Sequence, residues 1–403
     1  MDQIAIIAIF VALYSAFAGG FERTPVNGAL VFAAFGLALG PFGTGILTGG
    51  LEVPTLRLIA ELSLALVLFV EASKVDLATL RRAFAIPQRL ILLALPVIIL
   101  LGMLFGFFLL SDISLIGLAI LATILAPTDA ALGKAVVTNK AVPGEIREGL
   151  NFESGLNDGV CVPVFLAFLT IANGQNAGDG FGSILFKLLI QEIGIGAVVG
   201  IVVTVLVGMA VKISDRNGWI HGSWIQVPVA AAAIACFAAA QALHGSGFIA
   251  AFVGGLCFGI LTGKDTDHLV HASEGTGDTF ALLTWVLFGS ALIGPSLPWI
   301  TWEVVVYALI SLTVVRMVPV FLALRGLPLT FGQKNFIGWF GPRGLATVVF
   351  AMMVLQSGLP DAKQIVAVAT CVVVFSIIGH GMSALPIIRW MFGSAPETGE
   401  DKH

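Results

Sequence analysis

The sequence predicts an all-α protein that crosses a membrane many times. Hydrophobic residues make up 58% of the 403-residue chain, and charged residues make up only 11%. A soluble domain carries about 25% charged residues, so this composition excludes an ordinary soluble fold. Apolar stretches of about 20 residues, the length that crosses a hydrocarbon layer of about 30 Å, recur along the whole chain.

Thirteen apolar stretches are predicted to span the membrane, and short polar breaks separate them. The first six cover residues 3–18, 26–40, 55–72, 88–110, 114–138 and 145–173. The first two of these are short. A seventh covers residues 183–211. The last six cover residues 223–242, 246–262, 276–294, 302–325, 333–357 and 363–391.

The basic residues predict how these spans are oriented. If the N-terminus lies outside, fifteen of the twenty Lys and Arg residues fall in inner loops, three at outer ends, and Arg316 and Arg343 within the membrane. Cytoplasmic loops carry an excess of Lys and Arg, so the C-terminus, with a short tail at 394–403, is expected in the cytoplasm. The start of the chain lacks the basic segment of a secretory leader, so the first span is expected to remain in the protein.

Two predicted spans contain a proline where a helix should continue. Pro127 interrupts the fifth span and Pro342 the twelfth, and proline both removes a backbone donor and clashes with the preceding turn. If the seventh span is a connector, residues 1–173 and 223–391 form two six-span halves of inverted topology, with the breaks at corresponding positions. Prolines are common in spanning helices, but two breaks in register indicate a transport site.

The sixth predicted span carries several polar residues in an otherwise apolar setting. Ser154 and Asp158 share one helical stripe, and Glu153 and Asn157 share the adjacent one. A charged side chain costs about 2.5–3.5 kcal/mol at the centre of a spanning helix, so such residues are expected to be functional. The alternative, a cytoplasmic loop helix, is disfavoured because Gly159 leads directly into an apolar stretch.

These oxygen-bearing residues predict a site for a monovalent cation, since Na⁺ or Li⁺ needs oxygen ligands when it leaves water. The predicted ligands are Asp158, Asp129, Ser154 and Thr128. Glu71, near the end of the third span, is predicted to close the site. The alternative is that Glu71 is an interfacial acid beside Lys74.

The buried acids also need positive partners. Glu153 is expected to pair with Arg316 or Arg343, because arginine meets a carboxylate through two hydrogen bonds and keeps its proton. The sequence leaves open which of the two it is. Four acids against two arginines leave a deficit of positive charge that protons or metal cations must fill. Competition of a cation and a proton for Asp158 therefore predicts coupled exchange.

Three segments resemble a known family. APTDAALG at 126–133, ESGLNDG at 153–159 and GPRGLA at 341–346 are similar to segments of the monovalent cation:proton antiporter superfamily, and more closely to its NhaP and NHE-type sodium/proton exchangers. The resemblance covers essentially the entire chain. It implies an NhaA/NhaP-like fold of two inverted repeats with crossed broken helices, divided into a dimerisation domain and a six-helix core domain.

The resemblance also implies an activity. It implies a homodimer in a prokaryotic plasma membrane that exchanges one Na⁺ or Li⁺ for one H⁺ by an elevator-like movement, with a role in sodium transport and pH homeostasis. By position, the family's ion ligands match Asp129, Asp158, Ser154 and Thr128, an acid that some members add matches Glu71, and the supporting network matches Asn157, Glu153 and an arginine. One departure is visible: the motif reads Thr-Asp-Ala where many members have Thr-Asp-Pro.

Other classes of function are weighed against this one. A cation channel would arrange the acids as a ring, and a Na⁺-coupled symporter of an organic solute would need a further polar cluster in the second half; neither pattern is present. No nucleophile and base pair and no metal-ligand spacing indicates an enzyme. No cofactor and no nucleic-acid partner are expected, and the choice among Na⁺, Li⁺ and K⁺ is open.

Overall fold

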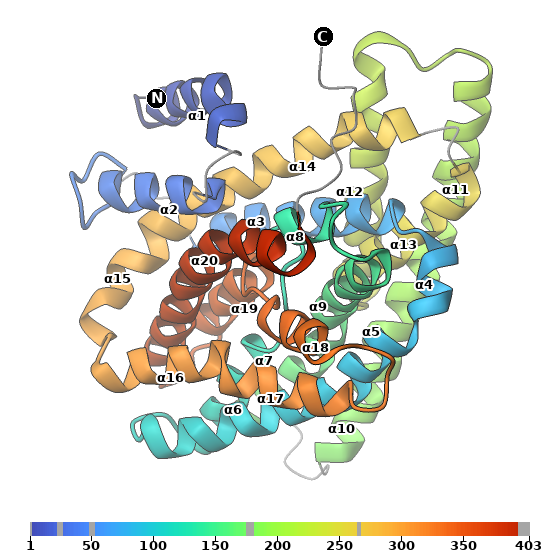
Figure 1. The fold of residues 1–403 in the computed structure, drawn as a ribbon. Coiled ribbons are helices and arrows are strands. Elements are labelled where there is room, and N and C mark those ends of the chain that lie inside the picture. The colour runs from blue at the N-terminus through green and yellow to red at the C-terminus, as the bar shows by residue number, and fades with distance from the viewer. Residues whose placement is uncertain (1, 22–26, 48–52, 175–180, 264–266, 394–403) are drawn as a thin grey trace.

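The computed structural model describes residues 2–21, 27–47, 53–174, 181–263 and 267–393 (Figure 1). Within these ranges every regular element is a helix, which confirms the predicted all-α class. The predicted tail at 394–403 lies outside the described residues.

Seven described helices are long and apolar enough to cross a membrane. They are Ala85–Leu109, Gly144–Ala172, Gly182–Arg216, Trp224–Ala242, His268–Trp299, Trp302–Ala323 and Ala362–Phe392. Five shorter apolar helices are Ala5–Gly20, Gly28–Leu39, Leu115–Ile124, Gly247–Thr262 and Leu345–Gln356. A multi-pass helical membrane protein is therefore confirmed, whereas thirteen crossings and inverted repeats stay predictions.

Nine α-helices lie in the described part of the first half of the chain. They are α1 (Asp2–Phe21), α2 (Gly28–Leu39), α3 (Val53–Ser73), α4 (Leu77–Ala83), α5 (Ala85–Arg89), α6 (Leu95–Leu109), α7 (Leu115–Ile124), α8 (Lys134–Val137) and α9 (Gly144–Ala172). A π-helical turn joins α5 to α6 without a break. Helix α7 is buried from Gly117 to Ile124 and packs against α6 and α9, so it lies in the interior.

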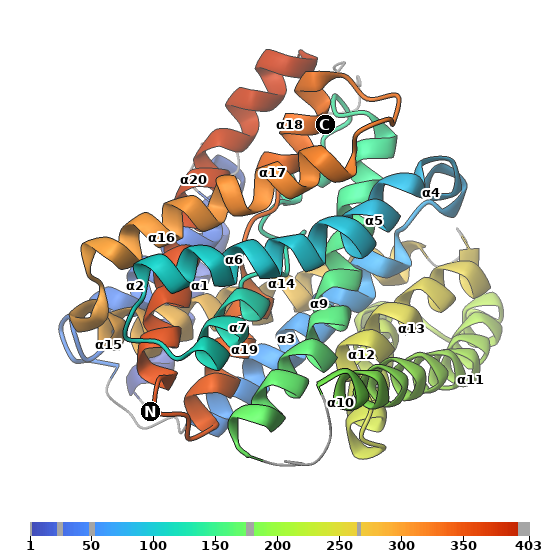
Figure 2. The ribbon, with the colours of Figure 1, turned by 90° about the horizontal axis from the view of Figure 1, so that it is seen from below.

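The remaining helices follow after residue 180. They are α10 (Phe181–Leu188), α11 (Gly196–Arg216), α12 (Val227–Ala242), α13 (Gly247–Thr262), α14 (Asp267–Phe288), α15 (Gly294–Ser296), α16 (Trp302–Leu312), α17 (Val314–Ala323), α18 (Phe331–Trp339), α19 (Leu345–Gln356) and α20 (Ala362–Phe392). Helices α16 and α17 run beside α6, as Figure 2 shows.

Two groups of helices flank the centre of the molecule. Helix α3 packs against α13 and α14, and α13 packs against α11 on its other side. Gly200 of α11 lies against the backbone of Ala250, where a Cβ atom would collide with the carbonyl oxygen, so α11 and α13 approach closely. On the other side, α20 packs against α16 and α19. Helix α19, which follows the second predicted break, also packs against α3 and so connects the two groups.

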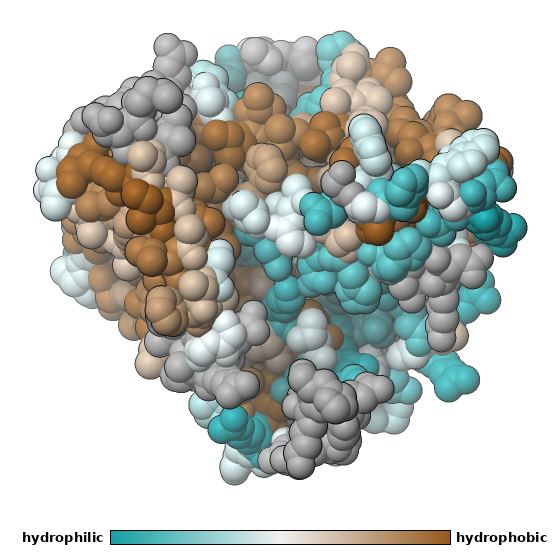
Figure 3. All heavy atoms as spheres, turned by 90° about the horizontal axis from the view of Figure 1, so that it is seen from above, coloured by the Kyte–Doolittle hydropathy of each residue, from teal (hydrophilic) through white to brown (hydrophobic). Residues whose placement is uncertain are grey.

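The outer surface is apolar where lipid is expected. Ile9, Leu13 and Phe17 of α1, and Val198 and Leu206 of α11, are all at least half exposed. Exposed residues of this kind suit hydrocarbon rather than water. The face seen in Figure 3 differs, because hydrophilic residues gather there around a hollow, and hydrophobic surface borders them.

Candidate ion-binding site

The first predicted break is present in the structure. Helix α7 begins after Ser114, whose hydroxyl oxygen accepts a hydrogen bond from the backbone of Gly117 (3.2 Å), and it ends at Ile124. Residues 125–133 are not helical, and α8 follows them. Pro127 lies within this stretch, which agrees with its missing backbone donor. Non-helical backbone at this depth is tolerated because residues 125–129 are buried in protein.

The second predicted break is also present. Helix α18 ends at Trp339, α19 begins at Leu345, and the five residues between them are not helical. Gly341 packs against the guanidinium group of Arg316, where a Cβ atom would lie 2.5 Å from Nε. A larger residue at Gly341 would therefore displace either the break or the arginine.

The two breaks meet at Asp129. Its backbone nitrogen donates a hydrogen bond to the carbonyl oxygen of Pro342 (2.8 Å). The backbone nitrogens of Leu345 and Leu132 donate to its Oδ2 (2.7 Å) and Oδ1 (3.0 Å). Asp129 is thus placed at the N-terminus of α19, where the helix dipole favours a negative charge. A carboxylate has about four lone-pair sites, so these donors leave room for a further ligand.

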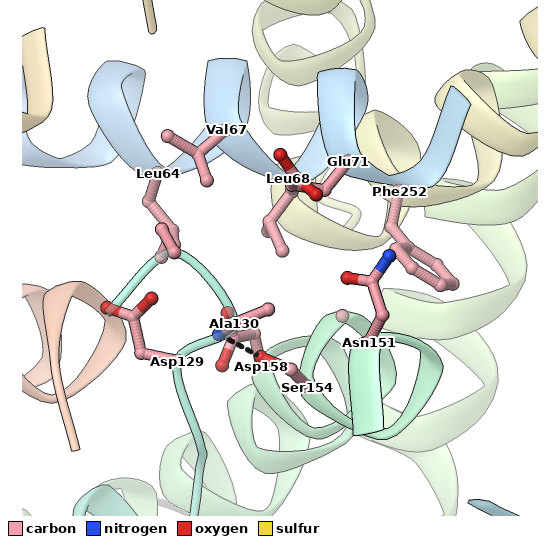
Figure 4. Close-up of a pocket in the computed structure, with 12 residues that line it drawn as sticks. Leu64, Val67, Leu68, Glu71, Asp129, Ala130, Asn151, Ser154, Asp158 and Phe252 are labelled. Carbon is pink, nitrogen blue, oxygen red and sulfur yellow. Dashed lines mark hydrogen bonds between the residues drawn. The ribbon is translucent and has the colours of Figure 1, made fainter. Parts of the chain in front are cut away.

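Ser154 and Asn157 of α9 attach that helix to the first break. The backbone nitrogen of Ala130 donates to Ser154 Oγ (2.8 Å, dashed in Figure 4), and Ser154 Oγ donates to the carbonyl oxygen of Thr128 (2.5 Å). Asn157 Nδ2 contacts Thr128 Oγ1 at 3.5 Å and Glu153 Oε1 at 3.3 Å. These contacts fix the predicted ligands relative to one another.

Asp158 differs from the acids around it. Its side chain is 2% exposed, and no described residue donates a hydrogen bond to its Oδ1. An isolated buried carboxylate is strongly disfavoured, so its charge requires a proton or a cation beside it. Among the predicted ligands, Asp158 therefore has the clearest need for a bound proton or cation, given the described residues around it.

A small cavity brings the predicted ligands together. Its volume is about 20 Å³, and Asp129, Ser154, Asp158 and Glu71 line it together with apolar residues of α3 and α13. This is room for about one water-sized group. In Figure 4, Glu71 extends from α3 on one side of the cavity, and Asp158 and Ser154 extend from α9 on the other.

Glu71 lies both at the cavity and beside Lys74, so each of the two positions expected for it is partly observed. It lines the cavity, and its carboxylate lies 3.6 Å from Lys74 Nζ, with a side chain 22% exposed. A second cavity of about 10 Å³ also touches Glu71 and continues to Lys134, Glu274 and Asp278. Glu71 therefore lies between the enclosed acids and a charged group on α8 and α14.

The structure decides which arginine pairs with Glu153. Arg316 Nη1 and Nη2 donate to the two carboxylate oxygens of Glu153 at 2.6 and 2.9 Å, and both side chains are 1% exposed. Arg343, also fully buried, instead donates through Nη1 to the carbonyl oxygens of Pro127 (3.3 Å) and Gly341 (3.1 Å). Arg343 therefore connects the two breaks.

Sequence reasoning missed two contributions. The backbone nitrogen of Arg343 donates to Ser376 Oγ on α20 (2.7 Å), and Ser376 is fully buried. Its place one turn before His380 in an apolar span was the available signal. Lys134 of α8 also pairs with Glu274 (2.9 Å) and Asp278 (3.1 Å) of α14. Nothing in the sequence indicated this pairing, which depends on how α8 and α14 pack.

In the parts of the chain that the structure describes, no group of three or more His, Cys, Asp or Glu side chains is placed to hold a metal ion. The site around Asp158 instead combines carboxylates with hydroxyl and carbonyl oxygens, a set of donors that suits a hard monovalent cation.

The chain is similar to known proteins along nearly its whole length. Residues 6–390 match the family described as sodium/hydrogen exchanger, transmembrane. The K⁺/H⁺ antiporter NhaP of Alkalimonas amylolytica is 25% identical over 93% of this chain and 64% of its own length. The Na⁺/H⁺ antiporter NhaH of Halobacillus dabanensis is 27% identical over 66% of this chain and 67% of its own length. The chain thus spans about two thirds of the length of these relatives.

A solved structure shares the fold. The sodium proton antiporter MjNhaP1 from Methanocaldococcus jannaschii, at pH 8, superposes with a TM-score of 0.75 at 18% identity, covering 94% of this chain and 99% of that one. The family match extends over both helix breaks and the polar segment of α9, and it identifies a group of transporters rather than enzymes. The chain belongs to the transmembrane sodium/hydrogen exchanger family.

Proposed function

We propose that the protein is a secondary active antiporter that exchanges a monovalent cation, Na⁺ or Li⁺, for H⁺ across a prokaryotic plasma membrane. The carrying observation is the carboxylate of Asp158, which is buried beside two broken helices in a cavity with room for about one ion. A proton and a dehydrated cation compete for that carboxylate. Because each displaces the other, their opposite flows are coupled.

The charges around the cavity support one-for-one exchange. Glu153 pairs with Arg316 and Glu61 with Arg57. Glu71, at the edge of the cavity, lies 3.6 Å from Lys74, which also bonds to Glu274 at 2.8 Å, so Glu71 belongs to this outer charged group. The described buried charges that remain are two acids, Asp129 and Asp158, and one base, Arg343. Their sum is one negative charge, which either one proton or one monovalent cation balances. Both loaded forms are then neutral and can move, whereas the unloaded form carries a charge that the apolar barrier opposes.

The arrangement of the helices supports alternating access by an elevator-like movement. The cavity is bounded by α3 and α13 on one side and by α9 and the first break on the other. We propose that α9 and both breaks move as one body against α3, α13 and α14, within a homodimer. The thirteen spans, the inverted repeats, the outer N-terminus and the cytoplasmic C-terminus belong to the same proposal.

The size of the cavity disfavours the alternative of an organic solute symporter, since about 20 Å³ does not accommodate a solute molecule. A larger cavity of about 310 Å³ lies elsewhere, between Asp112 and Gln364, and shares no residue with the site. A channel is disfavoured because the acids gather around one small cavity beside the breaks rather than in a ring. A cation flux that needs no opposite flow of protons would favour the channel.

The test is proton movement into or out of proteoliposomes, followed with a pH-sensitive dye while Na⁺, Li⁺ or K⁺ is added. The wild-type protein is expected to respond to Na⁺ and Li⁺, and the K⁺ response decides whether the specificity extends to K⁺. Asp158→Asn is expected to abolish the response, because a neutral amide takes up no proton near neutral pH and so cannot exchange a proton for a cation. Asp112→Asn, which changes an exposed acid in the loop before α7, is the matched control and should keep the full response. Exchange retained by Asp158→Asn would remove Asp158 from its proposed role.

A further inference from the structure

The two helix breaks are held by serines in the same way. In the first break the backbone nitrogen of Ala130 donates to Ser154 Oγ (2.8 Å), and in the second that of Arg343 donates to Ser376 Oγ (2.7 Å). Each serine lies on the long helix that follows its break, α9 or α20. One helical turn after each serine, a buried ionisable residue follows: Asp158 after Ser154, and His380 after Ser376.

We infer that His380 is the second half's counterpart of Asp158, and that it acts as a positioning residue which holds the second break, and through it Asp129, in place. The inference deepens the proposed function, because it adds a residue to the same ion site. It concerns a residue that the exchange mechanism above does not use, on a helix that does not line the cavity.

The first step is the contact between His380 and Ser376. His380 Nδ1 lies 3.0 Å from Ser376 Oγ and 3.1 Å from the carbonyl oxygen of Ser376. The carbonyl oxygen can only accept, so the imidazole tautomer with its hydrogen on Nδ1 satisfies both contacts, and Nδ1 donates to the carbonyl oxygen and to Ser376 Oγ. The indole ring of Trp339 packs on the imidazole, with a centroid distance of 5.0 Å. Ser376 Oγ thus accepts from both His380 Nδ1 and the Arg343 backbone nitrogen, and the imidazole holds it beside the second break.

The second step runs from Arg343 to the ion site. The backbone nitrogen of Leu345, two residues later, donates to Asp129 Oδ2 (2.7 Å), and Arg343 Nη1 holds the carbonyl oxygen of Pro127. The backbone of Gly344, between these residues, packs directly against the Asp129 carboxylate, with which a Cβ atom there would collide. A shift of the Arg343 amide therefore displaces groups that fix Asp129 and the first break.

A matched pair of substitutions isolates this role. His380→Leu keeps the approximate size of the side chain but has no polar atom, whereas His380→Asn can place its amide nitrogen, a donor, near the position of Nδ1. Ser376→Ala removes the hydroxyl that accepts from the Arg343 backbone nitrogen, and it changes the volume of the core less than His380→Leu does. Thr370→Val is the control, because it removes an equally buried hydroxyl from the same helix that contacts Ser296 and not the break.

The decisive readout is hydrogen exchange of the backbone amides, measured by mass spectrometry on the purified full chain in lipid nanodiscs. We expect His380→Leu and Ser376→Ala to speed exchange in peptides covering 340–347 by about tenfold, because the Arg343 amide loses its partner. His380→Asn and Thr370→Val should stay within about threefold of the wild type. Unchanged exchange in both His380→Leu and Ser376→Ala, or equal acceleration in His380→Asn, would overturn the inference.

Transport supplies a second readout. In proteoliposomes, His380→Leu is expected to raise the half-saturating cation concentration by about tenfold with a smaller effect on the maximal rate, and His380→Asn should restore most of the affinity. The two proposals fail separately. If the wild-type protein exchanges no ions, the proposed function is wrong, but the hydrogen-exchange measurement still tests the role of His380. If the wild type is active and the variants show unchanged amide hydrogen exchange, only the role of His380 is wrong.

Discussion

The pair formed by Glu153 and Arg316 shows what residue spacing can and cannot predict. That Glu153 would need an arginine follows from its place in a membrane span. Which arginine it takes does not, because Glu153 and Arg316 are 163 positions apart and meet only when α9 packs near α17. Ser154 and Asp158, four residues apart on one helix, could be placed together from the sequence, since the helical repeat alone sets their relation.

The same pair gives a stability prediction. Arg316→Met leaves the buried carboxylate of Glu153 without compensation, and breaking a buried pair in this way costs about 3–5 kcal/mol. We expect a clear fall in thermal stability, measured with a thiol-reactive dye that reaches Cys161, Cys236 and Cys371 when the protein unfolds, since all three are buried.

Two comparisons make that result specific. The double variant Glu153→Leu with Arg316→Met is expected to recover most of the stability, because it leaves no unpaired charge. Lys134→Met breaks pairs with Glu274 and Asp278 in which Lys134 is 47% exposed, and it should cost no more than about 2 kcal/mol. If Arg316→Met melts no earlier than Lys134→Met, the ion pair is not structural.

At the scale of whole helices, the breaks were predictable and their consequences were not. Pro127 and Pro342 predict interruption from the chemistry of proline alone, and the structure places non-helical backbone at both. That the breaks contact each other through Asp129 and Pro342 depends on tertiary packing, which spacing does not encode. The pairing of α8 with α14 through Lys134 is of the same kind.

That pairing predicts a dependence on ionic strength. Lys134 bonds to Glu274 and Asp278 across the boundary at which α8 is proposed to move against α14. Half-exposed pairs are worth about 0.2–1 kcal/mol each and are screened by salt, so screening should speed the movement by up to about fivefold. We expect the wild-type exchange rate to rise when choline chloride is added, and the rate of Lys134→Gln to be faster at low salt and to respond less.

The control for this prediction is Lys140→Gln, which removes an exposed positive charge from the loop between α8 and α9. It should keep the wild-type salt response, because it does not touch α14. A Lys134→Gln protein with the same rate and the same salt response as the wild type would show that these pairs do not restrain the movement.

At the scale of the whole molecule, composition was enough to predict a multi-pass helical protein, because 11% charged residues cannot cover a soluble surface. Hydropathy also located the apolar stretches that the structure folds into helices. The sum of the buried charges, by contrast, could not be predicted without the structure. The sequence suggested four acids against two arginines, whereas the folded chain places Glu71 in an outer charged group with Lys74 and Glu274 and pairs Glu153 with Arg316. The enclosed charges that remain, on Asp129, Asp158 and Arg343, sum to one negative charge.

That balance of minus one predicts electroneutral exchange. If one proton replaces one cation, a cycle moves no net charge, so a membrane potential does no work on it. An exchanger that moved one net charge per cycle would gain about 2.3 kcal/mol per 100 mV, which corresponds to a shift of about fiftyfold in the ion gradient it sustains. We expect the gradient of Na⁺ against H⁺ sustained by wild-type proteoliposomes to be unchanged when a potential of about 100 mV of either sign is imposed. A gradient that follows the imposed potential would mean that a second charge travels with the ion, and Glu71, at the edge of the cavity, would be the first acid to test by its replacement with glutamine.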